Sequence, residues 1–535
     1  MKINFRRING YVYGALQHSV ALTIDTSETF SPVERDILER LFAQVRDATD
    51  GSDPSSSAGD EDGYGKLSCV IDYLNRYSGD QRFTDIRRVD SAQSVTFYIP
   101  TISAGLVLNS IEGLFKRFKQ ADTPPADLHL DEIAQACKAS GRKNLPAGTN
   151  AANFISVAAR RHVPFRILSS RHIIFGYGAS SRIFDSSLAE DESTVGTNMS
   201  KSKSLTNQLL NMAGFPVAQQ VSVNNLKHAL RVAQEIGYPV VLKPNSEDQG
   251  RGVYASIGNA SELETCFREA AEKYSNFLIE KHVDGDVYRI VAFKDRIIRT
   301  VYRPAPTLTG DGTHTLRELI DLENQKPERN RVGSSLQRIK INQDLARMAA
   351  KQGLTLDGVP HKDQIVRLSS GLAGSQSREM DTPLHPDNIK LCTDVAKTMR
   401  LSLAGVDLIS KDPSVPWHEN NAIICEVNAQ PQLGSTDPSV YVKFLTAYLQ
   451  KVPEIHVYVS NNVSRTLAPI YNKSLHSLDV RISPESIRTH GLPCQYYTSL
   501  SFGEDVTSQD RDAIAELVQS RAPNDRFEPI APSDA

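Results

Sequence analysis

The sequence predicts a mixed α/β (α+β) protein built from several domains, and three observations support this class. With 535 residues and a typical domain of about 150 residues, the chain has room for three or four compact units. Apolar and polar residues alternate over 19–25, which is the period of a strand, and a helical pattern follows over 32–46. Further along, residues 202–212 and 225–236 have helical patterns and residues 238–244 read as a buried strand.

The composition is that of a soluble, folded protein. The 60 Lys and Arg residues nearly balance 63 Asp and Glu residues, for a net charge of -3. A near-neutral chain has no summed field that would hold nucleic acid or an anionic membrane. With 40% hydrophobic and 23% charged residues, the chain is too apolar to be wholly disordered. We therefore expect no nucleic-acid partner and no membrane partner.

Cysteine usage and the absence of targeting signals predict a cytoplasmic protein. The six cysteines are scattered without a C-x-x-C pair, which argues against a zinc ribbon or a dithiol redox site. The first seven residues include basic side chains, but no apolar segment typical of a secretory signal follows them. No apolar run approaches the roughly 18 residues that a membrane-spanning helix needs.

The N-terminal part reads as an α/β unit that contains one acidic loop. Ser31 precedes the helix predicted over 32–46 and is a suitable cap for it. The acidic, Ser- and Gly-rich segment 50–65 cannot bury apolar surface, so we expect a flexible loop there. Residues 148–184 alternate short apolar runs with Gly-containing turns, which is consistent with more α/β structure.

A lysine and a glycine-containing loop form the first candidate site. Lys243 lies near the end of the buried strand 238–244, and the following loop contains Gly250, Arg251 and Gly252. Strand-like residues 253–257 come next, so we expect a hairpin that acts as a lid. An ammonium group and exposed backbone amides could surround phosphates. Walker and Rossmann glycine motifs are absent, and Lys243 alone could equally be a surface lysine.

Acidic residues on later strands supply further candidates. The apolar segment 277–283 contains Glu280, and its backbone could contact an adenine edge. The buried strands predicted over 404–409 and 422–428 each contain a carboxylate, which is costly to bury unpaired.

Two positions apart on the second of these strands, Glu426 and Asn428 share one face. Together with Asp407, they offer hard oxygen ligands of the kind that Mg2+ prefers. Any one of these acids could instead pair with a nearby Arg or Lys.

Taken in this order, the segments resemble the ATP-grasp ligases and, within them, the cyanophycin synthetase group. The similarity spans roughly residues 148–449, and the N-terminal part matches only loosely. Its most specific stretches are Lys203-Ser204-Leu205-Thr206, Val241-Leu242-Lys243-Pro244, Gly250-Arg251-Gly252-Val253, the run Gly310 to Leu319, Leu384-His385-Pro386-Asp387-Asn388, Ala404-Gly405-Val406-Asp407 and Glu426-Val427-Asn428-Ala429.

The resemblance implies a role for each matched residue. It makes Arg303 and Lys243 the catalytic residues, with Arg303 near the transferred phosphoryl group. The remaining assignments are Lys203 and Lys243 with Gly250, Arg251 and Gly252 for the ATP phosphates, Glu280, Lys281 and Val283 for the adenine hinge, Asp286 for the ribose, and Asp407, Glu426 and Asn428 for Mg2+, with Mn2+ as the alternative metal.

Three departures from the family pattern limit what can be transferred. Val287 stands where an acid that grips the ribose is expected, so Asp286 would have to substitute. Gln432 replaces the glycine of the usual Pro-Gly-Leu, which affects the loop that shapes the substrate site. The sequence also lacks the Mur-ligase-like domain with its own phosphate loop, so only one ATP site is expected. The strand-like residues 455–462 are either a relic of that domain or an unrelated strand.

From this we expect an ATP- and Mg2+-dependent, ADP-forming ligase that joins amino acids, or extends a short peptide, through an acyl phosphate. The expected domains are an N-terminal α/β domain over 1–198, which could bind substrate, an ATP-grasp domain over 199–449, and a small C-terminal α/β segment over 450–535. Amino acids or peptides are the expected substrates, and self-association into a homo-oligomer is consistent with the resemblance.

Two alternatives stay open. A glutamate-cysteine or glutathione-type ligase would have a similar grasp domain and a thiol-bearing substrate. A nucleotide-binding pseudoenzyme would keep the fold without turnover. The changes at Val287 and Gln432 motivate the second alternative, whereas the complete set of Lys243, Asp407 and Glu426 argues against it.

Overall fold

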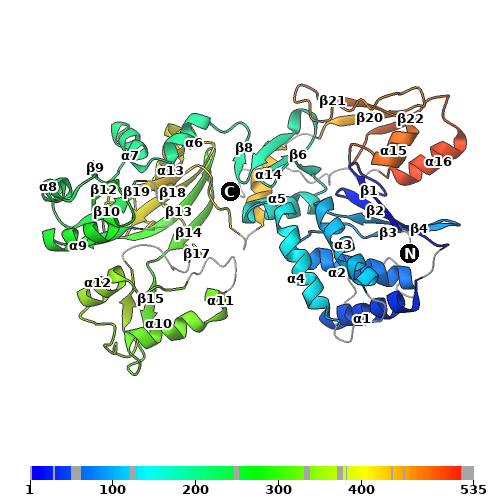
Figure 1. The fold of residues 1–535 in the computed structure, drawn as a ribbon. Helices are drawn as coiled ribbons and strands as arrows, with labels where there is room; N and C mark the ends of the chain where they lie inside the picture. Colours follow the sequence, from blue (N-terminus) through cyan, green and yellow to red (C-terminus); the bar gives the residue numbers. More distant parts are fainter. Residues whose placement is uncertain are drawn as a thin grey trace. The chain divides into compact units, whose positions relative to one another are not determined.

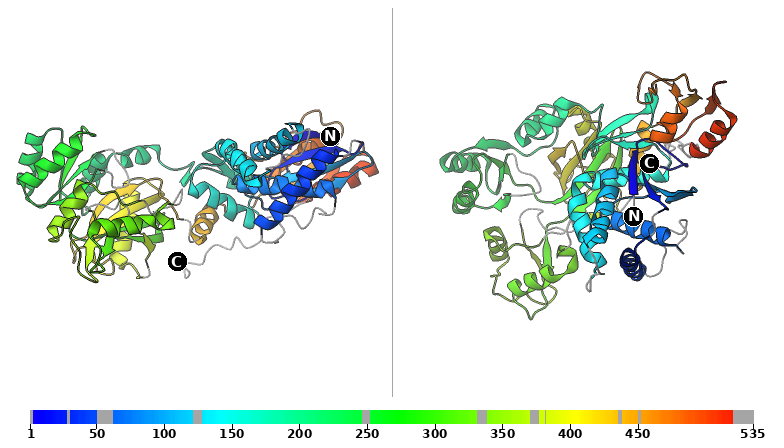
Figure 2. Two further views of the ribbon diagram at one scale, coloured as in Figure 1. Left: turned by 60° about the horizontal axis from the view of Figure 1, so that its bottom comes forward. Right: turned by 45° about the vertical axis from the view of Figure 1, so that its right-hand side comes forward.

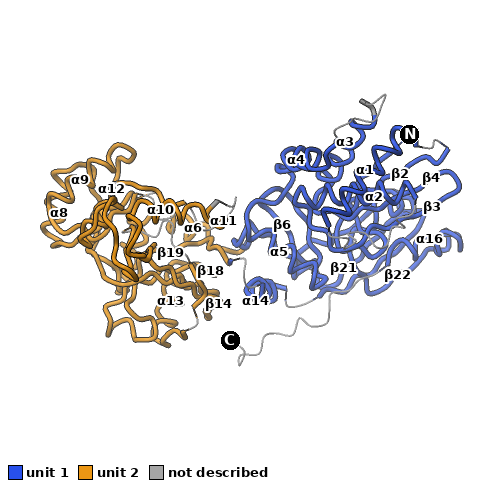
Figure 3. Tube along the Cα trace, turned by 90° about the horizontal axis from the view of Figure 1, so that it is seen from below, with its two compact units in different colours: residues 1–190, 434–534 blue, residues 191–433, 535 orange. Residues whose placement is uncertain are grey.

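The computed structural model describes residues 3–27, 30–49, 62–120, 128–245, 252–330, 338–369, 377–380, 382–434, 438–449 and 452–519. They form two compact units (Figure 3). Unit 1 consists of residues 1–190 and 434–534, and unit 2 consists of residues 191–433. The chain therefore leaves unit 1 after Glu190 and returns to it at Gly434. The expected three-domain division at residues 198 and 449 stays a prediction.

Unit 1 begins with a four-stranded antiparallel sheet covered by helices on one face. The strands β1 (Ile3–Ile8), β2 (Ser19–Asp25), β3 (Arg87–Asp90) and β4 (Ser94–Pro100) lie in the order β1-β2-β4-β3. Val20, Leu22 and Ile24 of β2 point to one face, where their buried side chains share a core with the helices α1 (Pro32–Ala48), α2 (Gly63–Tyr77), α3 (Ala104–Gln120) and α4 (Leu130–Gly141). Figure 1 shows these helices beside the sheet. The alternating pattern of 19–25 thus predicted this strand correctly.

Side chains that cap the helices explain where two of them begin. Ser31 caps α1 as predicted, because it accepts a hydrogen bond from the Glu34 amide at 3.2 Å. The Glu34 side chain also accepts one from the Ser31 amide, so the cap is a complete capping box. The loop predicted over 50–65 was too long. Asp62 accepts a hydrogen bond from the Gly65 amide at 2.7 Å, so α2 already begins at Gly63. Residues 50–61 lie outside the described part.

The remainder of unit 1 combines residues from both ends of the chain. One antiparallel sheet contains β5 (Phe165–Ile167), β6 (His172–Phe175), β7 (Arg182–Asp185) and β8 (Leu188–Ala189), with α5 (Thr149–Arg160) and α14 (Ser439–Tyr448) alongside; short 3-10 turns span Arg142–Asn144 and Gly178–Ser180. The C-terminal residues form a parallel sheet ordered β21 (Ser477–Ile482), β20 (Glu454–Val459), β22 (Ser499–Phe502), with α15 (Pro484–His490) and α16 (Ser508–Leu517).

N-terminal and C-terminal segments share one core in this unit. Ile8, Val12 and Ala21 pack with the apolar residues of β20 and β21. The amide of Tyr11 donates to the Leu492 carbonyl at 2.7 Å, and the Leu492 amide donates back at 3.0 Å. In both views of Figure 2 the orange and red C-terminal elements lie beside the blue N-terminal strands.

Two antiparallel sheets of four and five strands form most of unit 2 as described. The first is ordered β11 (Tyr254–Ile257), β10 (Val240–Pro244), β12 (Phe277–Lys281), β9 (Gln220–Val223), and packs with α8 (Leu226–Ile236) and α9 (Ala260–Ala271). The second is ordered β17 (Arg378–Glu379), β14 (Arg296–Arg303), β13 (Asp286–Phe293), β18 (Leu403–Ser410), β19 (Ile423–Asn428), and one face packs with α13 (Pro386–Thr398). The strands predicted around Lys243, Glu280, Asp407 and Glu426 are therefore all present, and β10 and β11 form the predicted hairpin.

Three further parts complete unit 2. Helices α6 (Thr194–Ser200) and α7 (Lys203–Met212) precede β9 in the chain, and α7 contacts β19. A small module, residues 304–369, contains the strand pair β15 (Thr307–Thr309) and β16 (Ile365–Arg367) with α10 (Leu316–Gln325), α11 (Pro327–Asn330) and α12 (Gln343–Lys351). No helix among the residues described is long and apolar enough to cross a membrane.

Candidate active site

Strand pairing in the second sheet lines up two of the candidate carboxylates with an arginine on one face. Arg289 of β13 stands opposite Asp407 of β18, and Asp407 stands opposite Glu426 of β19. Directly paired residues of an antiparallel sheet point to the same face. The apolar side chains of β13 and β18 point to the other face, where α13 covers them. The charged face is therefore the one available for chemistry.

Asp407 is held by two arginines. The Arg289 guanidinium donates to both carboxylate oxygens, through Nη2 to Oδ2 at 2.8 Å and through a shorter contact from Nε to Oδ1. Arg303 Nη1 lies 3.6 Å from the same Oδ2. Burial lowers the pKa of Arg289, but the adjacent Asp407 carboxylate more than offsets this, so the pKa stands above its ordinary value. For Arg303 burial prevails and its pKa is lowered.

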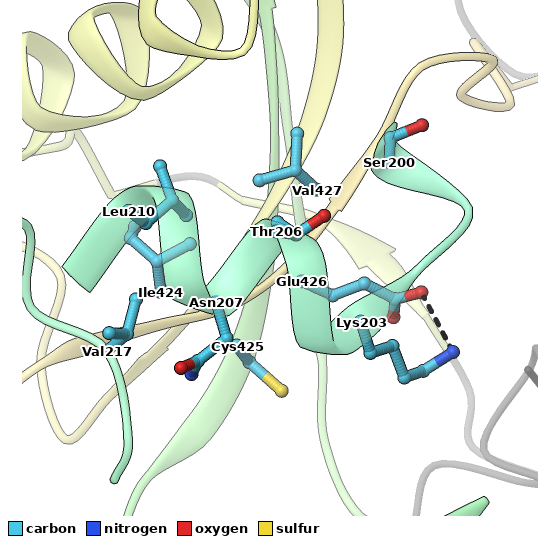
Figure 4. Close-up of a pocket in the computed structure, with 10 residues that line it drawn as sticks. All are labelled: Ser200, Lys203, Thr206, Asn207, Leu210, Val217, Ile424, Cys425, Glu426 and Val427. Carbon is cyan, nitrogen blue, oxygen red and sulfur yellow. Dashed lines mark ion pairs between the residues drawn. The ribbon is translucent and has the colours of Figure 1, made fainter. Parts of the chain in front are cut away.

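Glu426 is the carboxylate of this face with the strongest reason to bind a cation. Burial raises the pKa of its carboxyl, and the neighbouring charge of Asp407 raises it further. Lys203 at the start of α7 opposes this effect, with Nζ 3.8 Å from Glu426 Oε1, and the two side chains point toward each other in Figure 4. The charges of Arg289 and Lys243 also lower the pKa of Glu426, so cations from both sheets act on this carboxylate.

Lys243 forms a buried ion pair. Its Nζ lies 2.6 Å from Glu280 Oε1, and the two residues are only 5% and 7% exposed. Gln220 of β9 donates to the same oxygen in a short contact. Burial lowers the pKa of Lys243, but the Glu280 carboxylate and other nearby negative groups outweigh it, so the pKa is raised. Lys243 therefore carries a charge in a site from which water is largely excluded.

The structure offers a fit test for the predicted metal ligands. Asp407 and Glu426 are neighbouring carboxylates on paired strands, and such a pair is stabilised by a cation between or beside them. Asn428 lies two positions after Glu426 on β19 and shares its face, and its ligand atom would be the amide oxygen Oδ1, whereas the Nδ2 donor is buried without a hydrogen-bond partner among the described residues. Two carboxylates and an amide suit a hard cation. We find the three residues compatible with a divalent ion, although Asp407 is already shared with Arg289.

The other predicted site residues occupy different surroundings. Lys281 Nζ donates to the carbonyls of Gly237 at 2.8 Å and Tyr238 at 3.2 Å, and Val283 follows β12. Gly252 has φ +71°, and an added Cβ would lie 2.7 Å from the Tyr274 ring, so glycine is required there. Gly250 and Arg251 lie outside the described residues.

Asp286 is not brought to the charged face. It lies three positions before Arg289 on β13, so the strand alternation points its side chain to the opposite face. There its Oδ2 accepts a hydrogen bond from Tyr302 at 2.9 Å. Val287, the residue that departs from the family pattern, is the one that shares a face with Arg289.

Two residues of the site were not predicted. Arg289 gave only a partial signal, because strand alternation places it on the same face as Val287, whereas its contact with Asp407 depends on the order of the strands. Cys425 gave no signal in the sequence, because its position depends on a bulge between β18 and β19. Asp407 pairs with Glu426 but Leu408 pairs with Ile424, so Cys425 is the extra residue. Burial raises the pKa of its thiol to about 12. It lines a pocket with Ser200, Lys203, Thr206, Asn207, Leu210, Val217, Ile424, Glu426 and Val427 (Figure 4).

Comparison with known proteins identifies the class of domain that this geometry represents. Residues 202–290 match the family "Carbamoyl-phosphate synthase L chain, ATP binding domain". Over these residues the chain is similar to an ATP-grasp domain, and the matched stretch contains the first sheet with Lys203 and Lys243, whereas Asp407 and Glu426 lie outside it.

Over about half of its length the chain is similar to cyanophycin synthetases. It is 30% identical over 296 residues to cyanophycin synthetase of Synechocystis sp., which covers 54% of this chain and 34% of the relative. It is 28% identical over 260 residues to the glutathione biosynthesis bifunctional protein GshAB of Mannheimia succiniciproducens, covering 46% of this chain and 34% of the relative. The chain thus spans about a third of the length of these relatives.

Among solved structures, the bifunctional glutathione synthetase of Pasteurella multocida aligns with a TM-score of 0.41 and 17% identity. The alignment covers 80% of this chain and 82% of that one.

Proposed function

We propose that this protein is an ATP-dependent, ADP-forming ligase that forms an amide bond between the carboxylate of one amino acid or short peptide and the amine of another. The observation that carries the proposal is the meeting of cations and carboxylates at Glu426. Lys203 Nζ lies 3.8 Å from this half-buried carboxylate, the charges of Lys243 and Arg289 also act on it, and Asp407 stands opposite it on β18. The similarity to cyanophycin synthetases and to GshAB supports the same reaction class.

The charges of this face suit phosphoryl transfer to a carboxylate. An attacking carboxylate must approach an anionic γ-phosphate, so catalysis depends mainly on neutralising charge and aligning the groups. In our proposal Lys203 and Lys243 neutralise phosphate oxygens, and Arg303 stabilises the transferred group. Because Arg303 and Lys243 lie in a largely buried site, their charges are less screened than at the surface.

The same burial protects the intermediate. An acyl phosphate hydrolyses readily in water, so the carbonyl must meet the amine before solvent reaches it. Asp407, Glu426 and Asn428 would hold the divalent cation, for which we propose Mg2+, with Mn2+ as the alternative. When bound, this ion would withdraw negative charge from the phosphate oxygens. Arg289 keeps Asp407 in position for this role through its paired hydrogen bonds.

The decisive experiment is ATP-dependent phosphate release with pooled amino acids and dipeptides, followed by mass spectrometry of the products. We expect substrate-dependent release, an amide product, and loss of both in Glu426→Ala. Asp394→Ala is the matched control, because Asp394 pairs with Lys390 on α13, behind the apolar face of the same sheet. Tight ATP binding without turnover for any substrate pool would instead support a nucleotide-binding pseudoenzyme.

A glutathione-type ligase is the second candidate, favoured by the similarity to GshAB. Pools with and without cysteine separate the two candidates, because a glutathione-type ligase needs the thiol-bearing amino acid. We further propose that the protein acts in the cytoplasm, where its six cysteines, none of which forms a disulfide, would stay reduced. Self-association and the substrate-binding role of the N-terminal domain also remain proposals.

A further inference from the structure

Strand β11 contains a bulge beside the strand that carries Lys243. Two residues of β11, Ala255 and Ser256, stand opposite the single residue Val241 of β10. Ser256 has φ +55°, a left-handed conformation that a serine seldom adopts within a strand. A bulge disrupts the local ladder and redirects backbone groups. The carbonyls at this point therefore need partners from outside the sheet.

Helix α12 of the small module supplies those partners. Arg347 Nη2 donates to the Ala255 carbonyl at 2.8 Å, and Nη1 lies 3.5 Å from the Ser256 carbonyl. Lys351, one turn later on the helix, also donates to the Ser256 carbonyl in a short contact. Both bulge residues are thus bonded to cations that come from a segment about 90 residues further along the chain.

Acidic residues fix these two cations in place. Arg347 Nη2 lies 2.7 Å from Asp344 Oδ1, and Asp344 is only 7% exposed. Glu262 at the start of α9 lies 3.0 Å from Lys351 Nζ and 3.5 Å from Arg347 Nη1. The contact is therefore a charged network between the module and both β11 and α9. We call Arg347, Lys351 and their four partners the α12 tie.

We infer that Arg347 and Lys351 are positioning residues for nucleotide binding, acting through the hairpin that holds Lys243. Among the residues that the structure describes, β11 is an edge strand paired with β10 alone, and the bulge interrupts that pairing. Without the α12 tie the hairpin would sample more arrangements, and nucleotide binding would have to order it. The inference rests on the proposed function, because it assumes that Lys243 meets the phosphates of ATP.

Nucleotide affinity is the test, because a merely structural contact would leave it unchanged. The full chain is titrated with the fluorescent nucleotide TNP-ATP and Mg2+, and the double variant Arg347→Met, Lys351→Met is compared with wild type. Because nucleotide binding must then order the hairpin, the double variant should bind TNP-ATP about tenfold more weakly, which corresponds to about 1.4 kcal/mol. Arg347→Lys should recover part of the loss. Arg317→Met is the matched control, because Arg317 belongs to the same module but pairs with Asp357 at 3.0 Å.

Hydrogen exchange of the peptide 253–258 completes the experiment. We expect faster exchange in the double variant and no change in Arg317→Met. Faster exchange with unchanged TNP-ATP affinity would overturn the inference, because the α12 tie would then stabilise β11 without serving the site. Should the double variant not fold, Arg347→Lys alone decides by the same two readouts. Failure of the wild type to bind TNP-ATP would refute the proposed function itself, and the inference with it.

Discussion

Two ion pairs of the same length allow the energetic effect of burial to be measured directly in unit 2. Lys243 Nζ lies 2.6 Å from Glu280 Oε1, with side chains only 6% and 9% exposed. Lys397 Nζ also lies 2.6 Å from Asp295 Oδ1, but these side chains are 56% and 79% exposed. Geometry is therefore matched and burial is not. A difference between the two pairs must come from the surroundings.

Breaking the buried pair should destabilise the protein strongly. Removing one partner leaves an uncompensated buried charge, which costs about 3–5 kcal/mol. We therefore expect Lys243→Met and Glu280→Met each to lower the free energy of unfolding by this amount. The double variant should cost clearly less than the sum, since no unpaired charge remains. Lys397→Met should cause no measurable change, because solvent screens the exposed pair.

Urea unfolding without nucleotide, followed by tryptophan fluorescence, provides the assay. Trp417 is the single tryptophan of the chain and lies in unit 2, where it packs against the core of the second sheet, so its signal reports on this unit. The raised pKa of Lys243 means that the pair's stabilisation is complete below the ordinary lysine pKa and is lost only at higher pH. A measurement at pH 7.5 therefore includes all of it. Single-variant losses below about 1 kcal/mol, or simple additivity in the double variant, would refute the reasoning.

Three further predictions concern other parts of the chain. Burial raises the pKa of Asp80 to about 7. Between about pH 4 and 7 the folded state therefore keeps a proton that the unfolded chain releases, and the free energy of unfolding falls as the pH rises. Asp80→Asn should remove up to about 4 kcal/mol of that fall. Thermal unfolding at pH 5 and pH 8 tests this, and an equal change in stability between the two pH values for wild type and variant would contradict it. Gly252→Ala should weaken TNP-ATP binding at least about threefold, since φ is +71° and the Cβ would meet Tyr274; equal affinity would show that the strain is relieved elsewhere. EDTA should abolish the stabilisation of wild type by ATP but change Glu426→Ala little, and an equal response of both proteins would argue against Glu426 as a metal ligand.

Local sequence patterns were sufficient for individual elements of this protein. The apolar run that contains Lys243 and the alternating run at 19–25 each predict a strand from the pattern of adjacent residues alone. The cap at Ser31 is equally local. What these patterns do not contain is the partner of each strand, because pairing is decided by packing between segments that can be hundreds of residues apart.

The site shows the same division between local and distant information. Glu426 and Asn428 could be placed on one face because strand alternation is local. Strand alternation also places Asp286 and Arg289 on opposite faces of β13. The sequence alone does not say which of these faces lies in the site, so it could not exclude Asp286 as the ribose contact. The contact of Glu280 with Lys243 and that of Arg289 with Asp407 required the strand order. The extra residue at Cys425 required the bulge, which leaves no mark in the sequence pattern.

The interrupted layout of unit 1 has a consequence for biosynthesis. A ribosome releases the chain from the N-terminus, so β1 and β2 emerge long before β20 and β21, whose side chains complete the core around Ile8 and Val12. Until then one face of the first sheet stays exposed to solvent. Residues 191–433 are continuous in the sequence and can form their core without later segments. Unit 2 can thus fold first, and the growing chain must keep the early strands from associating with other chains until β20 and β21 are made.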